Sequence, residues 1–288
     1  MSSVEKRQYD HDFLQNGEGL SDKEKALLRI PDRLKTPEDA KEIRELLLAL
    51  DFVRCDGGHI LMGREEGLPC TIEGQRRNET PKREFEIPPF YISKYTVTNA
   101  EYEIHDPRHS RTNTSKGDRS PATCMTYGRA IGFAHWLNQQ TGLAFSLPTE
   151  PQFMAAVAPY GWLYPHKPDG TPDRHIQNNY KAYVDAYPEG EIGAAMDVDD
   201  PRVPENYLGL NHASGNVSIF TFGHYPTAGH WGANSDGSYV VIVGGNFRLC
   251  PYGTRTITRG IIDVTGIFDT VGIRLVHPDP DHLLSSKI

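Results

Sequence analysis

The chain has 288 residues, of which 38% are hydrophobic and 24% charged, and its formal net charge at pH 7 is -8. This length is enough to bury a hydrophobic core in one large domain or two small ones. The negative charge excludes a general binder of nucleic acids or anionic membranes, because phosphate recognition needs an excess of Lys and Arg.

The amino terminus and the cysteines indicate the cellular location of the chain and the redox state of its thiols. No apolar run is long enough to cross a bilayer, and the opening MSSVEKRQYDHDF lacks the apolar core of a signal peptide. We therefore expect a cytoplasmic protein, or one displayed on a virus particle or another surface by a non-classical route. No CxxC pair is present, so neither zinc binding nor thioredoxin-like chemistry is indicated. Free buried thiols are expected at Cys55, Cys70, Cys124 and Cys250.

The first helix is predicted after a charged amino-terminal arm. Thr36 suits an N-cap, Pro37 the first helical position, and Asp39 the acidic position of a capping box. We assign residues 1–51 to the arm and this helix, and residues 52–288 to the main domain. The apolar stripe of the helix, at helical spacing, consists of Ile43, Leu46, Leu47 and Leu50.

Short strands and further helices are predicted next. Residues 52–63 are typical of a hairpin with two glycines at its turn. Residues 85–103 predict a strand and then a polar stop that caps a short helix at Thr98. Two longer helices follow, at 126–142, with Thr126 as N-cap and Gly142 as terminator, and at 147–158, with Thr149 and Gln152 as a capping box.

The carboxy-terminal half shows little helical periodicity. From 159 to 207 the chain is rich in Pro, Gly, Asp and Tyr, which predicts ordered loop. Strands are predicted in SGNVSIFTFG, in SYVVIVGGNF and in the terminal VGIRLV. A few helices followed by loop and short strands favour an α+β fold over a layered α/β fold.

A series of short motifs follows in order along the chain. They are ILMG at 60–63, YISKYTVTNAEY at 91–102, RAIGFAHWL at 129–137, LPTE at 147–150, NYLGL at 206–210, GNV at 215–217, GGNF at 244–247, Arg255 with Arg259, and GIR at 272–274. In this order they resemble the formylglycine-generating-enzyme family, also called the sulfatase-modifying-factor family, and the resemblance covers about 52 to 277. It implies a C-type-lectin-like fold of the formylglycine-generating-enzyme subtype, with few helices, short twisted antiparallel strands and much ordered loop.

The chain departs from this family at the residues that catalytic members use. Those members bind copper through two cysteines shortly after the Gly-Gly motif, whereas only Cys250 lies in that region here. A soft Cu(I) site of two thiolates needs both partners. Sulfoxide synthases with this domain take iron-binding histidines from a separate helical domain, for which the lead-in of about fifty residues is too short. We therefore predict no catalytic residue, metal or cofactor, and favour a protein that is not an enzyme.

Other metal sites have competing interpretations. The family's calcium ligands beside Gly-Asn-Val are replaced by His212 and Ile219, and neither supplies a carboxylate. Together with His224 and His230, His212 is either part of a metal site or one of several surface or hydrogen-bonded histidines. A cation site or a solvated acidic loop is formed by Asp197, Asp199 and Asp200.

The end of the chain has an unusual composition. From Gly232 to Ser286, 55 residues include no Lys, Glu, Gln, Met or Trp. None of these residue types has a codon ending in a pyrimidine. The gap resembles the product of diversity-generating retroelements, whose variable proteins share this lectin-like fold and whose randomised codons derive from Asn codons near the carboxy terminus. The resemblance places a variable region at 246–271.

This resemblance implies a ligand-binding surface in that region. Relatives have polar residues after the Arg pair, whereas this chain has several apolar ones. An exposed apolar patch with polar neighbours marks an interaction site. We predict a binding module that presents a diversified surface to an unknown protein or glycan. The predicted contacts are Phe247, Arg248, Leu249, Cys250, Tyr252, Thr254, Thr256, Thr258, Ile261, Ile262, Asp263, Val264, Ile267, Phe268 and Asp269.

Two alternatives to this binding module stay open. One is a metal-dependent oxidoreductase related to formylglycine-generating enzyme or the sulfoxide synthases, with a metal held by histidines or Cys250. The other is a structural homologue in which the tail strands are simply core. The direction of the side chains separates display from a structural homologue with a core tail. Display requires a set of side chains to project outward on one face of the protein, namely those of Arg248, Leu249, Tyr252, Thr254, Thr256, Ile261, Asp263 and Phe268.

Overall fold

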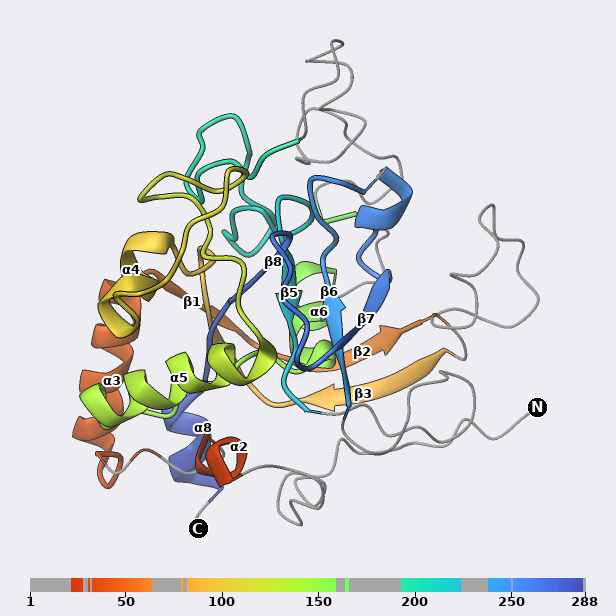
Figure 1. Cartoon of the computed structure of the whole chain (residues 1–288). Coiled ribbons are helices and arrows are strands. Elements are labelled where there is room, and N and C mark those ends of the chain that lie inside the picture. The colour runs from red at the N-terminus through yellow and green to blue at the C-terminus, as the bar shows by residue number, and fades with distance from the viewer. Residues whose placement is uncertain are drawn as a thin grey trace, which may run out of the picture.

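The computed structural model (Figure 1) confirms an α+β fold of short helices and short strands joined by long loops. It describes residues 22–27, 31, 33–63, 79, 82–158, 164–165, 193–223, 238–249 and 251–286. The helices are α2 (Asp22–Leu27), α3 (Pro37–Ala49), α4 (Asn99–His105), α5 (Tyr127–Thr141), α6 (Glu150–Val157), α8 (Pro280–Ser285) and the 3-10 turn η2 (Pro251–Thr254).

The described strands form three small sheets. A three-stranded sheet has the order β1-β4-β9, a two-stranded ribbon pairs β2 with β3, and a four-stranded sheet has the order β7-β6-β5-β8. All the pairings are antiparallel except β5 with β8. The strands are β1 (Phe52–Cys55), β2 (Gly58–Met62), β3 (Arg83–Ile87), β4 (Phe90–Ser93), β5 (Ser218–Phe220), β6 (Tyr239–Val243), β7 (Arg259–Asp263), β8 (Val271–Gly272) and β9 (Val276–Pro278).

The helix boundaries follow the predicted caps. Thr36, Thr98 and Thr149 each accept a hydrogen bond from the backbone three residues on and complete a capping box. Thr126 caps α5, and Gly142 ends it in the left-handed conformation. These bonds satisfy backbone donors that a helix start leaves unpaired, so a local pattern is enough to set the boundary.

The predicted hairpin at 52–63 is wrong. β1 pairs with β4 and β2 pairs with β3, so the two strands belong to different sheets. At Gly57, which has φ +67°, a Cβ atom would lie 2.1 Å from the carbonyl oxygen of Ile87. The glycine therefore lets the chain pass close to another strand's backbone, and does not serve to turn β2 back on β1.

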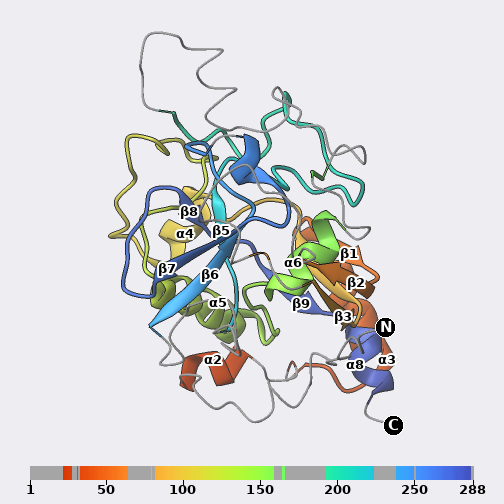
Figure 2. The same cartoon turned by 90° about the vertical axis from the view of Figure 1, so that its right-hand side faces the viewer.

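The four-stranded sheet is covered on both faces. Along β6, Val240 belongs to the same apolar cluster as buried residues of α5, and Val241 to the cluster that contains α6. Figure 2 shows α6 between this sheet and the β2–β3 ribbon, with which it is in contact. Alternate side chains of one strand thus enter two different cores, as the pleat of a strand dictates.

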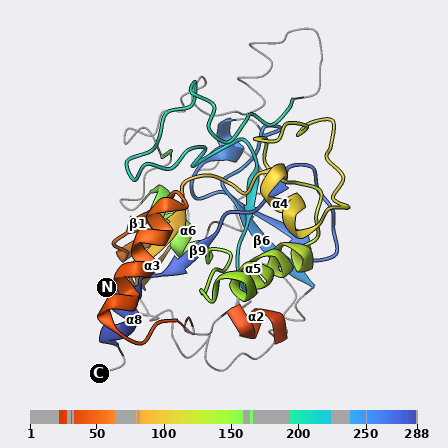
Figure 3. The same cartoon turned by 90° about the vertical axis from the view of Figure 1, so that its left-hand side faces the viewer.

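The two terminal helical segments pack against the domain. In Figure 3, α3 lies beside α8 and α2 lies beside α5, and both pairs are in contact. Arg44 of α3 pairs with Asp281 of α8. The predicted stripe of α3 is buried at Ile43 and Leu47, whereas Leu50 is exposed at the C-cap.

Several other predictions can be placed. Cys55 is a free buried thiol, as expected, and Cys124 is free but only half-buried, whereas Cys70 and Cys250 lie outside the described residues. Of the loop predicted at 159–207, residues 164–165 and 193–207 are described, without helix or strand. Each helix in the described ranges is too short or too polar to span a bilayer.

His277 on β9 makes the folded state sensitive to acid. Burial lowers the pKa of its imidazole to about 4, from an ordinary value of 6.5. Between these two pH values the unfolded chain binds a proton that the folded chain does not. The stability that neutral His277 contributes is therefore fully present above pH 6.5 and is lost as the pH falls toward about 4. On acidification from pH 7 to pH 4.5, we expect the free energy of unfolding to fall by about 2 kcal/mol because of His277.

Urea denaturation at several pH values tests this. His277→Gln should lose less stability on acidification than the wild type, because the buried group no longer titrates. The exposed His282→Gln is the matched control and should keep the wild-type acid response. Identical acid responses of His277→Gln and wild type would contradict the assignment.

Candidate ligand-binding surface

The predicted variable region runs through η2 and β7 and then crosses to β8 on the opposite edge of the four-stranded sheet. The loop at 264–270 lies over the face that α5 also covers, since Val264 and Phe268 pack on the cluster containing α5. The backbone N–H of Cys124 donates to the carbonyl of Phe268 at 2.9 Å. The region therefore follows the sheet closely and does not stand away from it.

Part of the predicted surface is buried, which corrects the expectation that it projects outward. Phe247, Thr254, Thr256 and Thr258 are all buried. The half-buried Phe268 packs on the core, as do Ile262 and Val264. Arg248 and Asp263 are exposed as expected, whereas Leu249 and Ile261 are half-buried. The Tyr252 side chain and Cys250 lie outside the described residues.

Two buried ion pairs explain why 254–258 turns inward. The guanidinium of Arg255 donates to both carboxylate oxygens of Glu79, at 2.6 and 3.2 Å. The guanidinium of Arg259 contacts both oxygens of Glu150, with Nη2 at 2.6 Å from Oε2. All four side chains are buried. Because the pairs lie on either side of residues 256–258, they hold this stretch against the body.

The Gly-Gly motif brings a second segment against the same stretch. A Cβ atom on Gly245 would lie 2.6 Å from the carbonyl oxygen of Gly253 and 2.8 Å from Cα of Thr254. Gly245 also has φ +67°, which disfavours other residues. The hydroxyl of Ser214 donates to the carbonyl of Thr254. Thr254 is therefore enclosed by backbone.

The outward-facing remainder combines charged and apolar groups. Ile267 is 60% exposed, although it is a large apolar side chain. The Arg248 guanidinium pairs with Asp269 and lies over the ring of Phe247, 5.6 Å from its centroid. Asp269 also accepts a hydrogen bond from the Thr114 hydroxyl at 3.2 Å. These groups form a small surface that combines one apolar side chain with an ion pair.

Three neighbours of this surface were missed by the sequence analysis. Thr114 and Cys124 come from loops more than a hundred residues upstream, for which no sequence signal was available. Tyr239 is 38% exposed and lies opposite Asp263 in the β6–β7 ladder. Its position at the start of the predicted strand, where an aromatic residue with a polar tip precedes the apolar run Val240–Val243, was the sequence signal that could have identified it.

The thiol of Cys124 lies beside the Arg248–Asp269 pair, and both burial and this pair affect its pKa. Burial raises its pKa, and Asp269 raises it further, while Arg248 lowers it. A raised pKa keeps the group in the unreactive thiol form at neutral pH. Its residue adopts φ 55°. Cys124 therefore contributes a small, neutral side chain beside the ion pair.

The position of the family's calcium site is occupied by protein contacts. The side-chain oxygen of Asn216 accepts from the backbone of Met196 at 2.8 Å, and His212 Nε2 lies 3.0 Å from the carbonyl of Asp197. Ile219 is buried in β5. These bonds hold the 193–200 loop beside Gly-Asn-Val without any carboxylate from positions 212 or 219.

The acids of that loop have partners of their own. Asp199 pairs with Arg119, Asp200 pairs with Arg202, and Asp197 accepts from the hydroxyl of Ser120 at 2.7 Å. Within the described parts of the chain, no three His, Cys, Asp or Glu residues are grouped as a metal site. His224 and His230 lie outside those parts, so the histidine prediction stays untested.

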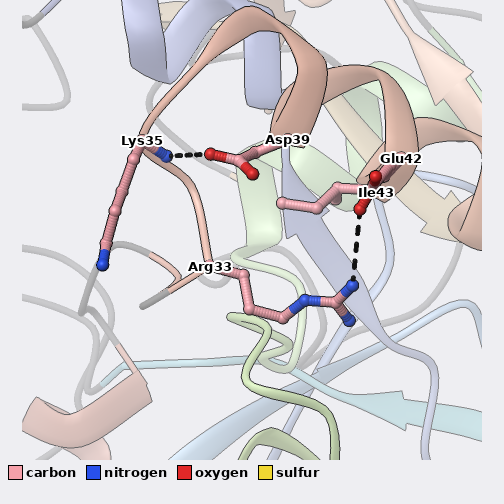
Figure 4. Close-up of a pocket in the computed structure, with 5 residues that line it drawn as sticks. All are labelled: Arg33, Lys35, Asp39, Glu42 and Ile43. Carbon is pink, nitrogen blue, oxygen red and sulfur yellow. Dashed lines mark hydrogen bonds and ion pairs between the residues drawn. The ribbon is translucent and has the colours of Figure 1, made fainter.

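A separate small hollow at the start of α3 is a weaker candidate. It is lined by Arg33, Lys35, Asp39, Glu42 and Ile43. Figure 4 shows the Arg33 guanidinium directed at Glu42, 3.9 Å away, and the backbone nitrogen of Lys35 bonded to Asp39 at 2.9 Å. The acids are thus already engaged in local capping and pairing.

The profile of the sulfatase-modifying factor enzyme 1-like domain matches residues 40–278. The chain belongs to this family. The match includes most of α3, which the sequence analysis assigned to the arm. A comparison with curated protein sequences gave no match.

Solved structures of several proteins share the fold. PvdO from Pseudomonas aeruginosa is 20% identical, with a TM-score of 0.61 over 79% of this chain and 94% of its own. Treponema denticola variable protein 1 is 13% identical, with a TM-score of 0.61 over 78% and 94%. CarF is 19% identical, with a TM-score of 0.55 over 80% and 98%. At these identities the likeness establishes the fold alone, and the predicted subtype is confirmed at that level.

Proposed function

We propose that this chain is a ligand-binding module without a catalytic step, in which a retroelement diversifies part of the segment 246–271. The observation that carries the proposal is that some side chains of that segment are buried while others are exposed. Phe247 and Thr254 are fixed in the interior, whereas Arg248, Asp263 and Ile267 point outward from a frame held by buried ion pairs. Binding side chains on loops above a rigid frame can change with little effect on stability.

The chemistry of the outward side chains fits a protein or glycan ligand. An exposed apolar residue beside an Arg–Asp pair resembles the mixture found in interaction hot spots. The likeness in fold to a variable protein supports this proposal in a general way. Two solved structures of the same fold, PvdO and CarF, do not favour it over an oxidoreductase.

The genetic part of the proposal is tested in the DNA beside the gene. We expect a reverse-transcriptase gene and a near-copy of the codons for 246–271, differing from them only at template adenines. Codons for Thr254, Thr256 and Thr258 should vary less among cells than those for Arg248 and Ile267, because the threonines are buried. A fixed sequence in every cell, with no near-copy nearby, would refute diversification.

Two adjacent substitutions test the surface itself. Ile267→Lys should change the free energy of unfolding by less than about 0.5 kcal/mol, because the side chain is exposed. Phe268→Lys should cost several times more, since the ring packs on the core. Thermal denaturation measures both. Equal destabilisation by the two variants would show that Ile267 is not a surface residue, and stoichiometric copper or iron in the purified protein would favour the oxidoreductase.

A further inference from the structure

Among the described strands, β7 stands at an edge of the four-stranded sheet. It pairs with β6 on one side, and the described residues contribute no strand on its other side. The ladder is antiparallel, with Gly260 opposite Ile242 and Ile261 opposite Val241. An edge strand presents backbone groups that a further strand can bind.

The hydrogen bonds show which groups those are. The N–H of Val264 donates to the carbonyl of Ser238 at 3.0 Å, which makes this a hydrogen-bonded pair. Hydrogen-bonded and non-bonded pairs alternate along an antiparallel ladder. The backbone of Ile262 therefore faces β6, and that of Ile261 faces outward. The carbonyl of Val241, opposite Ile261, accepts from Thr221 of the neighbouring segment, as this register requires.

At this edge, Ile261 offers both an N–H and a C=O, and Asp263 offers an N–H. The carbonyl of Asp263 already accepts from Gly266 at 3.0 Å, so the edge ends there. Among the described residues, no backbone bond engages the outward groups of Ile261. In β7 the charged side chains Arg259 and Asp263 stand at the two ends, so the stretch from Gly260 to Ile262 carries no charge, Pro or bulge that would protect an edge. The half-buried Ile261 lies diagonally across from Tyr239, within side-chain reach.

We propose that β7 binds an extended segment of a protein ligand as an added strand, through the N–H and C=O of Ile261. This rests on the proposed binding function and assigns it a partner class. Main-chain bonds give affinity in such complexes, and alternate side chains give specificity. The arrangement suits a diversified surface, because the backbone contacts persist when neighbouring side chains change. The ligand residue facing Ile261 and Tyr239 is apolar.

The test uses linear peptides selected from a random phage-displayed library on the whole protein. Ile261→Pro removes the outward N–H, and proline is tolerated where an edge N–H faces solvent. Ile261→Val keeps the N–H and is the matched control. We expect binding to weaken about tenfold or more in Ile261→Pro and to stay within about twofold in Ile261→Val. In the wild type, the amide of Ile261 should become protected from hydrogen exchange when peptide is bound.

The exchange measurement decides the question even if Ile261→Pro does not fold. Unchanged exchange at Ile261, or peptides that bind Ile261→Pro as well as wild type, would overturn strand addition. A ligand from folded-protein or glycan libraries that is lost only in Ile267→Lys would also overturn it, and would leave the display function intact. If no library yields a ligand sensitive to Ile261 or Ile267, both proposals fail.

Discussion

Replacing Arg274 with methionine is expected to lower the free energy of unfolding by about 3 kcal/mol or more. The side chain is fully buried, and its guanidinium donates to the carbonyls of Ser93, Lys94 and Asn211 at 2.6, 2.7 and 2.7 Å. These carbonyls belong to two segments, the end of β4 and the loop at Asn211, which the Arg274 side chain connects. Removing the donors leaves buried acceptors without their partner, which costs more than the bonds themselves.

Urea denaturation with linear extrapolation measures this loss. Arg248→Met is the matched control, because it removes the same group from an exposed site and should cost less than about 1 kcal/mol. Arg274→Lys should also be destabilised, since one ammonium cannot reproduce the planar fork that reaches three carbonyls. An Arg274→Met protein within about 1 kcal/mol of wild type would show that the family's Gly-x-Arg does not hold this fold together.

Breaking the Glu150–Arg259 pair is expected to cost about 3–5 kcal/mol, because it leaves one buried charge uncompensated. Arg259 begins β7 and Glu150 is the first residue of α6, so the pair joins the edge strand to the helix behind it. Arg259→Met alone should therefore lower the free energy of unfolding by much more than the lost packing of the side chain predicts.

A double-mutant cycle with Arg259→Met and Glu150→Gln separates the two effects. The double variant should recover part of the loss, giving a coupling energy of about 2 kcal/mol or more. The exposed pair Arg119–Asp199, with 48% and 43% exposure, is the comparison and should couple by less than about 1 kcal/mol. Additive losses at Glu150 and Arg259 would mean that the pair does not anchor β7.

These buried pairs limit what the proposed variable segment can display. Arg255 and Arg259 belong to the family's Arg pair, and both are engaged with glutamates inside the protein. Substitutions at the buried residues between them should therefore change stability more than they change ligand binding. We expect functional variation to concentrate at Arg248, Ile261, Asp263, Ile267 and Asp269, whose side chains are exposed or half-buried and do not belong to the core clusters.

Much of the fold was predictable from residues that act locally. The capping threonines at positions 36, 98, 126 and 149 bond to backbone three residues on, so the helix starts were confirmed. The α+β class and the family subtype followed from short motifs kept in order. The hairpin at 52–63 failed because Gly57 serves a contact with Ile87, which is thirty residues away.

The sequence by itself determined the family and the starts of α3, α4, α5 and α6, because each depends on neighbours along the chain. Only the tertiary structure decided which predicted contacts point outward. Thr254 and Thr256 read as surface residues, yet they are buried beside Arg255, whose partner Glu79 lies far upstream. An ion pair between distant residues leaves no local pattern in the sequence. Here two such pairs, at Arg255 and Arg259, hold the residues between them against the interior of the protein.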